Sequence, residues 1–416
     1  MIQKRTAVIS CIVVCIASLL VCTLVFTGVA RLYLINQSTK GLGFVGVDGV
    51  DGSMDYSRLE EIRRILQKNA LWNPSDERLL NQAASAMAYG EQDRYARYYT
   101  KEEYEAFVSD AQGEYVGIGA AVNTDAQDGY VTIVHVYRDS PAQIGGLRMQ
   151  DKILAVDDQD VLGMTPSEVA NLARGESGTQ VKITVGRGTE VLDFVLTRQA
   201  VISDRVEWHM IDETIGFIRI YEFQGNAVEF FERAVAELLN EGMSGLVLDL
   251  RSNPGGDYDA VVQIADRLLP KGEIITLMSR DGEVLDRRMS DENMLGLPMV
   301  VLVNEYSASA SELLAGDVKD YEVGVLVGKT TYGKGVGQVF NSFDDGAVIC
   351  YTAFEYLTGK GNCPQDVGVK PDIVVEQDEE VLRNSLLLCT ERDVQYVKAL
   401  EVLRDLMQAA QLQPAA

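Results

Sequence analysis

Twenty-five consecutive residues, 6–30, carry no charged side chain, and this stretch limits where the chain can reside. As a helix it would be ~37 Å long at ~1.5 Å per residue, enough to cross a ~30 Å hydrocarbon core. Lys4 and Arg5 precede it, so the positive-inside rule places the amino terminus in the cytoplasm. A cleaved signal peptide ending near Gly28 and Ala30 is the alternative, but its apolar core usually spans only ~7–15 residues. We expect a single-pass anchor in a bacterial plasma membrane, with the remainder on the extracytoplasmic side.

The composition of the chain argues against two kinds of partner. Its 62 acidic and 37 basic residues give a net charge of -25, and this field repels the phosphate backbone of nucleic acids. There are only two histidines, His135 and His209, which excludes a histidine-rich metal site, and the spacing of Cys350, Cys363 and Cys389 resembles no zinc motif. We expect no nucleic acid, no metal and no other cofactor. One disulfide with a free thiol and three buried thiols both stay open for the cysteines.

The hydrophobic pattern changes along the chain and predicts a multidomain α/β protein. Apolar residues first recur at helical spacing, then short β-type runs alternate with Gly, Asp and Asn turns, and then apolar strands alternate with helices. Continuous apolar runs such as 300–303 are typical of strands that are covered on both faces. We expect a cytoplasmic stub and transmembrane anchor (1–35), a flexible linker (36–54), an N-terminal helical region (55–111), a β domain (112–200), an α/β core (201–375) and a C-terminal helical segment (376–416).

The β domain opens with a segment suited to binding the end of a peptide. Gly117, Ile118 and Gly119 stand within a predicted strand at 115–122, and glycines let successive backbone N–H groups converge on a carboxylate. The strand that follows can offer its edge to an extended peptide. Because a helix start at 139–142 and further β runs come next in a fixed order, this region resembles a PDZ domain. A turn-rich β domain without a ligand is the alternative.

A cluster of small residues follows the predicted strand 299–303 and leads into a helix. Such a corner exposes a side chain and leaves helix N-terminal N–H groups free. Ser309 would be positioned as a nucleophile, with the N–H of Ala310 as an oxyanion donor. Alternatively, Ser307, Ser309 and Ser311 only compete to cap the helix. These residues alone do not separate the two interpretations.

Two further segments favour catalysis. Lys334 lies between two glycines, and burial can lower the pKa of a lysine from ~10.4 by up to ~3–5 units, which would make it a general base. Gln338, four residues later, could orient the amine without adding a countercharge. Earlier in the chain, a predicted strand ends in an Asn-Pro-Gly-Gly turn, where Gly255 or, as the fallback, Gly256 could supply a second oxyanion donor.

These segments together resemble the carboxy-terminal processing proteases, also called tail-specific proteases. The resemblance rests on the Leu-Arg-x-Asn-Pro-Gly-Gly, Ser-Ala-Ser-Ala-Ser-Glu and Thr-Tyr-Gly-Lys-Gly-x-x-Gln segments, in this order, and covers about residues 55–375. It implies a PDZ domain beside a crotonase-like α/β core. It also implies the roles of nucleophile, base, assisting residue and oxyanion donors for Ser309, Lys334, Gln338, Ala310 and Gly255 (or Gly256), and of peptide binding for Gly117, Ile118 and Gly119. Gly337 departs from the family, which usually has valine there.

We therefore expect a membrane-anchored extracytoplasmic serine endopeptidase. It would cleave proteins near their C-termini after PDZ-mediated recognition, through an acyl-enzyme, and would form a homodimer or higher homo-oligomer. Two alternatives remain: a catalytically inactive, membrane-tethered PDZ adaptor that binds C-terminal peptides, and a crotonase-like acyl-thioester enzyme. The intact serine, lysine and glutamine argue against the first, and the PDZ-like domain and outward orientation argue against the second.

Overall fold

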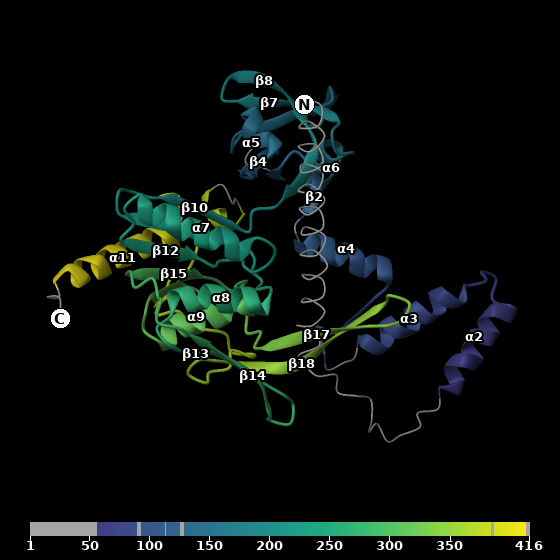
Figure 1. Cartoon of the computed structure of the whole chain (residues 1–416). Coiled ribbons are helices and arrows are strands. Elements are labelled where there is room, and N and C mark those ends of the chain that lie inside the picture. The colour runs from purple at the N-terminus through teal and green to yellow at the C-terminus, as the bar shows by residue number, and fades with distance from the viewer. Residues whose placement is uncertain (1–55, 90–92, 113, 125–128, 384–386, 413–416) are drawn as a thin grey trace, which may run out of the picture. The chain divides into compact units, whose positions relative to one another are not determined.

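The computed structural model describes most of the chain beyond its N-terminal segment (Figure 1). The described residues are 56–89, 93–112, 114–124, 129–383 and 387–412. The predicted membrane anchor and linker lie outside them. Within the described ranges no helix is both long and apolar enough to cross a membrane. The chain divides into two compact units, Met1–Asp76 and Glu77–Ala416.

The N-terminal helical region begins with α2 (Ser57–Asn69) in the first unit. The apolar spacing of Leu59, Ile62 and Ile65 predicts this helix, and the structure confirms it. None of its residues is buried, so its apolar side chains face solvent within the described part of that unit. The elements that follow are α3 (Asp76–Ala88), β1 (Arg97–Tyr99) and α4 (Lys101–Gln112).

The β domain is a six-stranded sheet with two helices. Its elements are β3 (Ala120–Thr124), β4 (Val131–Val136), β5 (Lys152–Val156), β6 (Gln159–Asp160), β7 (Gln180–Arg187), β8 (Glu190–Thr197), α5 (Pro141–Gly145) and α6 (Pro166–Ala173). The strand order β3-β4-β5-β7-β8 leaves β3 at an edge. One continuous strand over 115–122 was expected and is wrong. Gly119 has a φ of 82° and interrupts it, so β2 (Glu114–Gly117) pairs instead with β9 (Gln199–Ile202).

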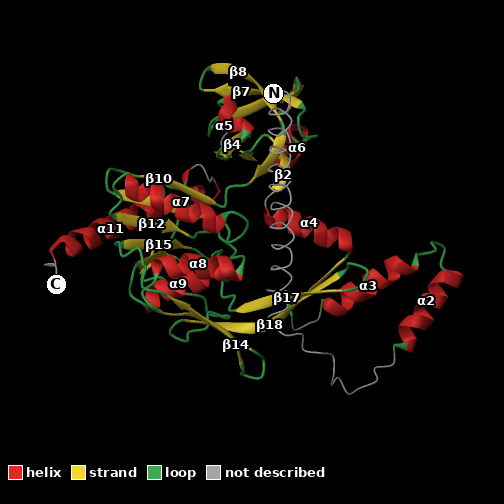
Figure 2. Ribbon diagram, viewed as in Figure 1, coloured by secondary structure: helices red, strands yellow, loops and turns green. Residues whose placement is uncertain are grey.

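The α/β core is built on a second six-stranded sheet, whose order is β10-β11-β12-β15-β16-β19 (Figures 1 and 2). Its strands are β10 (Val206–Met210), β11 (Ile215–Ile220), β12 (Gly245–Asp249), β15 (Met299–Val303), β16 (Val325–Gly328) and β19 (Ile373–Val374). All neighbours run parallel except β10 and β11. This agrees with the prediction of an α/β layer.

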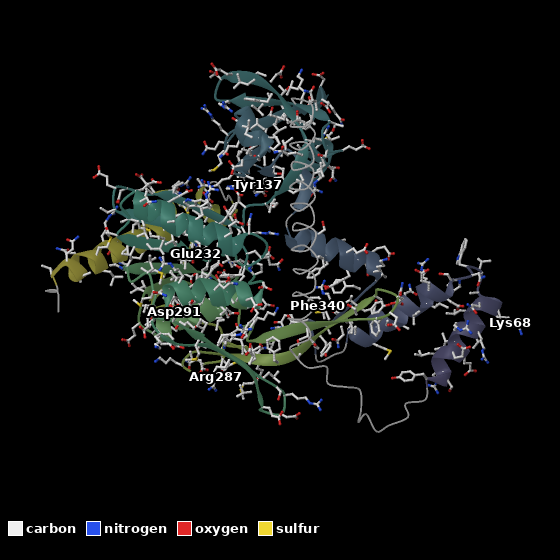
Figure 3. The ribbon with its side chains drawn as sticks, viewed as in Figure 1. Lys68, Tyr137, Glu232, Arg287, Asp291 and Phe340 are labelled. Atoms are coloured by element: carbon white, nitrogen blue, oxygen red, sulfur yellow. The ribbon has the colours of Figure 1, made fainter. Side chains whose placement is uncertain are left out.

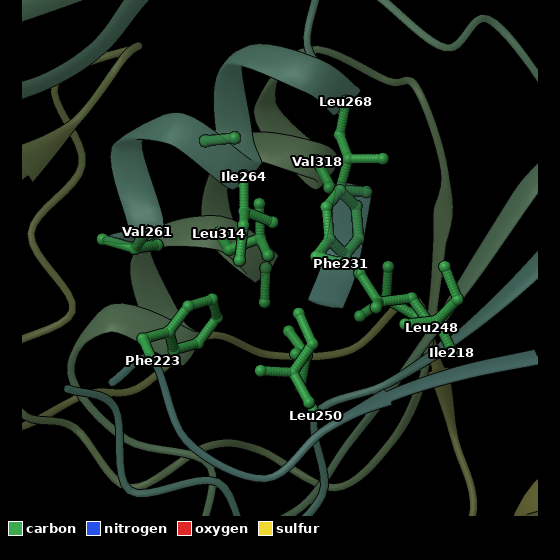
Figure 4. Packing of buried hydrophobic residues seen from close by; sticks show 14 of the residues in the cluster. Ile218, Phe223, Phe231, Leu248, Leu250, Val261, Ile264, Leu268, Leu314 and Val318 are labelled. Carbon is green, nitrogen blue, oxygen red and sulfur yellow. The ribbon is translucent and has the colours of Figure 1, made fainter. Parts of the chain in front are cut away.

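Both faces of this sheet are covered, which explains its uninterrupted apolar strands. Leu246 and Leu248 of β12 pack among residues of the helices α7, α8 and α9, whereas Val247 faces α11. Figure 4 shows Phe231, Leu248 and Leu314 in the first of these clusters. The helices are α7 (Ala227–Asn240), α8 (Tyr258–Leu268), α9 (Ala310–Asp320) and α11 (Val394–Leu412).

A third sheet, which the sequence pattern did not predict, flanks the catalytic region. Its strands are β13 (Gly272–Met278), β14 (Val284–Ser290), β17 (Val336–Ser342) and β18 (Val348–Thr358), together with β1. β17 and β18 form an antiparallel pair that is visible as two long arrows in Figure 2. Because Lys334 lies two residues before β17, this sheet helps to determine where the lysine lies.

The C-terminal helix α11 is buried along one side. Its buried side chains are Gln395, Tyr396, Ala399 and Leu403, whereas Val394 and Val397 are 40% and 45% exposed. A short helix, α10 (Glu379–Arg383), precedes it. The three cysteines of the described chain are free thiols, which settles the alternatives left open above in favour of no disulfide among them.

Candidate active site

Ser309 lies at the corner between β15 and α9, where the backbone is strained. Its φ of 55° and ψ of -115° place it in a region that residues other than glycine rarely adopt. The neighbouring Ala308 and Ala310 are buried, whereas Ser309 is partly exposed. The corner therefore presents this serine toward solvent at the start of a helix.

The two flanking serines have structural partners. The Ser307 hydroxyl donates to the Leu250 carbonyl oxygen at 2.8 Å, and the Ser311 hydroxyl donates to the Asn253 carbonyl oxygen at 3.0 Å. Both serines are fully buried. Ser309 begins α9 and forms a capping box with Glu312, whose Oε2 accepts from the Ser309 N–H at 2.9 Å. The outer two serines are buried and hydrogen-bonded to the preceding turn, whereas the middle one is partly exposed.

Lys334 is partly buried, and this burial lowers the pKa of its amine below the ordinary 10.5. Its Nζ atom lies 4.7 Å from the centroid of the Tyr95 ring. Across the described ranges, no hydrogen bond joins the Lys334 amine to the Ser309 hydroxyl. The lysine in this structure therefore rests on an aromatic face instead of on the serine.

Two buried residues nevertheless bind the main chains of Ser309 and Lys334 at the same place. The N–H groups of both residues donate to Glu312 Oε2, at 2.9 and 2.7 Å. The Tyr356 hydroxyl lies 2.8 Å from the carbonyl oxygen of each. The sequence analysis identified neither Glu312 nor Tyr356. The available signal was the position of Glu312, which stands three residues after Ser309 at the start of a helix, as in a capping box.

The predicted oxyanion donors lie beside Ser309 but are not equally free. A Cβ added to Gly255 would lie 2.8 Å from the Ser309 Cβ and 3.0 Å from the Ala310 nitrogen, so this glycine closely approaches the serine. The Gly255 N–H, however, donates to Asn253 Oδ1 at 2.9 Å. The fallback, Gly256, packs against the backbone of Phe223 instead, where an added Cβ would lie 2.5 Å from its carbonyl oxygen.

Among the described residues, no hydrogen bond joins the side chains of Gln338 and Lys334. Its amide Nε2 donates to Thr352 Oγ1 at 3.1 Å, and that hydroxyl donates to Asp93 Oδ1 at 2.9 Å. The predicted assisting residue is thus tied across the β17–β18 pair. A β-bulge between Gly337 and Gln338 shifts the register of β17 against β18. This shift sets the direction in which the Gln338 side chain points.

The departure from the family at Gly337 has a packing explanation. A Cβ at this position would lie 2.1 Å from Phe354 Cε2 on the partner strand. The aromatic ring therefore occupies the space in which a valine would stand. The Phe354 ring thus covers Gly337 and fills the space beside it.

Carbonyl groups of the predicted peptide-binding loop of the β domain accept hydrogen bonds from neighbouring residues. The Ile118 carbonyl oxygen accepts from the Ala142 N–H at 2.7 Å. The Gly119 carbonyl oxygen accepts from the Tyr137 N–H at 3.0 Å and the Ser140 hydroxyl at 3.1 Å. These bonds fix the carbonyl groups of the loop toward α5, next to the open edge strand β3. Elsewhere in the described chain, no cluster of three or more His, Cys, Asp or Glu side chains could hold a metal ion.

The β domain has an open edge strand, and the α/β core that follows it brings a strained serine and a desolvated lysine together. These features define a PDZ-containing serine peptidase. Residues 132–187 match the PDZ domain, and residues 214–375 match peptidase family S41. A probable CtpA-like serine protease of Staphylococcus aureus (strain bovine RF122 / ET3-1) is 30% identical over 387 residues, which are 91% of this chain and 76% of that protein. The chain belongs to peptidase family S41 and is a CtpA-like C-terminal processing serine protease.

A second relative is similar over most of both chains, and a solved structure shares the fold. A probable CtpA-like serine protease of Staphylococcus epidermidis is 28% identical over 86% of this chain and 72% of that protein. A Bacteroides fragilis structure described as an S41 protease shares the fold, with a TM-score of 0.55 and 17% identity over 83% of this chain and 97% of that chain. Membership of a peptidase family favours the enzyme over the inactive adaptor and the acyl-thioester enzyme.

Proposed function

We propose that Ser309 is the nucleophile and Lys334 the general base of the endopeptidase. The observation that carries this proposal is the pair of shared anchors, Glu312 and Tyr356, which bind the main chains of both residues. The lowered pKa of the lysine supports it further, because a general base must be neutral when it accepts a proton.

The reaction is an acyl transfer in two halves. Neutral Lys334 accepts the hydroxyl proton of Ser309 while the oxygen attacks the carbonyl carbon of the scissile peptide bond. The N–H of Ala310 and a second N–H from Gly255 or Gly256 stabilise the tetrahedral oxyanion. The Lys334 ammonium then protonates the leaving amine, and water, deprotonated by the same amine, hydrolyses the ester.

Three changes, two of side chains and one of a backbone N–H group, separate this structure from the reacting state. Lys334 must leave the Tyr95 ring and reach the Ser309 hydroxyl, which its flexible four-carbon stem allows while the main chain stays on its anchors. If Gly255 is the second donor, its N–H must also exchange Asn253 Oδ1 for the substrate oxyanion. Gln338 would assist only after leaving Thr352.

The PDZ domain would capture the C-terminus of a protein substrate along β3. Its edge position offers unpaired backbone groups to an extended peptide, and tethering raises the effective concentration of the cleavable segment at the core. The uncharged stretch 6–30 supports a plasma-membrane anchor with the protease on the extracytoplasmic side. The exposed apolar face of α2 supports a second copy of the chain as a further partner.

Labelling with a fluorophosphonate probe tests the dyad in the full-length protein. Wild type should be labelled on the tryptic peptide that contains Ser309, and Ser309→Ala and Lys334→Ala should not react. Lys329→Ala is the matched control, because this neighbouring lysine pairs with Glu305 at 3.0 Å and should be dispensable. Cleavage of an unfolded protein, read by mass spectrometry, should follow the same pattern, and full activity of either dyad variant would refute the assignment.

A further inference from the structure

One buried carboxylate ties the C-terminal helix α11 to the turn formed by residues 250–255. Asp393 stands directly before α11, and its Oδ1 atom accepts from the Tyr396 N–H at 3.0 Å, as in a helix N-cap. Both of its oxygens also accept from Arg251 Nη1, at 3.0 and 2.9 Å. Asp393 is fully buried, and Arg251 is 3% exposed. A carboxylate beyond the residues that match peptidase family S41 therefore holds a residue of the core.

Arg251 has a second carboxylate partner, which comes from its own segment. Asp249 Oδ1 accepts from the main-chain N–H and the Nε of Arg251, and Asp249 Oδ2 accepts from Nη2 at 2.8 Å. Because Asp249 ends β12 only two positions earlier, these bonds fold the arginine back onto the strand that leads into the turn. Asp393 stands 142 positions away. It is therefore the partner that joins Arg251 to a different part of the fold.

The same turn carries the corner that presents the proposed nucleophile. The Ser307 hydroxyl donates to the Leu250 carbonyl oxygen at 2.8 Å. The Ala308 N–H donates to the Asn253 carbonyl oxygen at 2.9 Å. Leu250 directly precedes Arg251, and Asn253 follows it two positions later. A displacement of the arginine therefore moves the two acceptors on which this corner rests.

The cluster is enclosed, so water cannot replace a lost partner. Gln395, which is 1% exposed, accepts from Arg251 Nη1 at 3.3 Å and donates to the Val375 carbonyl oxygen at 2.8 Å. By contrast Glu232, labelled in Figure 3, lies 3.7 Å from Arg267 with half of its side chain exposed. A surface pair of that kind contributes little, whereas removal of one member of a buried pair leaves an uncompensated charge.

We propose that Asp393 is a positioning residue of the peptidase, which acts through Arg251 to hold the 250–255 turn, and with it Ser309 and Gly255, in place. This rests on the proposed role of Ser309 as the nucleophile. Asp393 contacts neither the substrate nor the reacting atoms. Its loss should therefore change the rate of acylation and leave substrate binding as it is, because a misplaced nucleophile slows the reaction steeply.

Asp393→Asn tests this proposal in the full-length protein. The amide oxygen can still accept from the Tyr396 N–H and cap α11, but the negative charge opposite Arg251 is lost. We expect kcat for a dye-labelled unfolded protein and the rate of fluorophosphonate labelling to fall about tenfold, with KM unchanged and the far-UV circular dichroism spectrum retained. A wild-type labelling rate in the folded variant, or a higher KM at constant kcat, would overturn the proposal.

Asp212→Asn is the matched control. Asp212 precedes β11, at the end of the sheet opposite to the 250–255 turn. Its Oδ1 atom accepts from the N–H groups of Thr214 and Ile215 at 2.9 Å each, and its carboxylate lies 3.5 Å from Arg404 of α11. This variant also removes a charge beside α11, so it should lower the unfolding temperature and leave kcat unchanged. An equal loss of kcat in both variants would show a general effect of stability and overturn the positioning role.

Gln395→Ala decides the question if Asp393→Asn does not fold. It removes the longer hydrogen bond to Arg251 and should lower the labelling rate about threefold, whereas a wild-type rate would overturn the proposal. Failure of the catalytic assignment is distinguishable, because Ser309→Ala would then still react with the probe. A Ser309-dependent label together with a wild-type rate in Asp393→Asn refutes only the positioning role.

Discussion

The N–H groups of Ser309 and Lys334 donate to one carboxylate oxygen, Oε2 of Glu312, although one residue begins α9 and the other lies in the loop between β16 and β17. This shared acceptor fixes the two main chains relative to each other. It leaves the lysine side chain free to rotate between the Tyr95 ring and the serine. The proposed catalytic pair is thus held together by hydrogen bonds of its backbone.

Replacement of Glu312 by glutamine should lower kcat/KM about 10²-fold. The carboxamide presents an NH2 group to donors that now share a carboxylate, and each buried donor left without a partner costs about 1–3 kcal/mol. The rate of fluorophosphonate labelling should fall in parallel, while the far-UV circular dichroism spectrum is retained. Wild-type labelling by a folded Glu312→Gln protein would show that the shared acceptor is not needed.

Tyr356→Phe should weaken both folding and catalysis. Its buried hydroxyl bridges the carbonyl oxygens of Ser309 and Lys334, so its loss should lower the free energy of unfolding by about 1–3 kcal/mol and kcat about tenfold. Tyr321→Phe is the control, because it removes a phenol that donates to the Glu273 carbonyl oxygen at 2.7 Å, away from the dyad. Equal loss of kcat in both variants would assign the effect to general stability.

Activity should rise with pH through the pKa of Lys334, at a pH below the ordinary 10.5. Burial lowers this pKa because it disfavours the ammonium, and only the neutral amine can act as the base. For the same reason the unfolded chain binds this proton more tightly, so the contribution of Lys334 to stability rises with pH between the lowered pKa and 10.5. The pH dependence of kcat/KM provides the measurement, and a flat profile over pH 6–10 would contradict the expectation.

Tyr95→Leu should shift the acidic limb of that profile to lower pH. The ring stabilises the ammonium of Lys334, which lies 4.7 Å from its centroid, and a partly desolvated cation–π contact contributes about 0.5–2 kcal/mol. Since 1.36 kcal/mol corresponds to one pKa unit, the expected shift is about 0.4 to 1.5 units. Tyr95→Phe keeps the ring and should leave the limb in place; a shift of equal size in both variants would implicate the hydroxyl instead.

Asp317→Asn should stabilise the protein at pH 8 more than at pH 5. Burial raises the pKa of Asp317 well above 3.8, so the folded state holds this proton more tightly than the unfolded chain does. The free energy of unfolding therefore falls as pH rises above 3.8 and until the folded pKa is passed. Thermal unfolding at the two pH values measures this. Asp320→Asn, whose carboxylate accepts from Thr358 and Asn362, should destabilise at both.

Much of the core was predictable because its local pattern is unambiguous. The predicted strand over 299–303 matches β15 residue for residue, since burial on both faces of a parallel sheet requires uninterrupted apolar runs. Ser309 lies at the end of the loop after β15, and Lys334 lies in the loop between β16 and β17. Motif spacing along the chain was therefore sufficient to name them.

The sequence by itself determined which residues can carry the chemistry, because strand ends, glycine turns and small-residue corners depend on neighbours a few positions away. Only the tertiary structure decided how those residues are held. The sheet of β13, β14, β17 and β18 forms by pairing between distant, partly polar segments. The hydrophobic periodicity of each segment alone therefore does not predict this sheet. It places Lys334 against Tyr95, brings Tyr356 to the dyad and ties Gln338 to Thr352, since each of these contacts joins segments that only long-range folding can bring together.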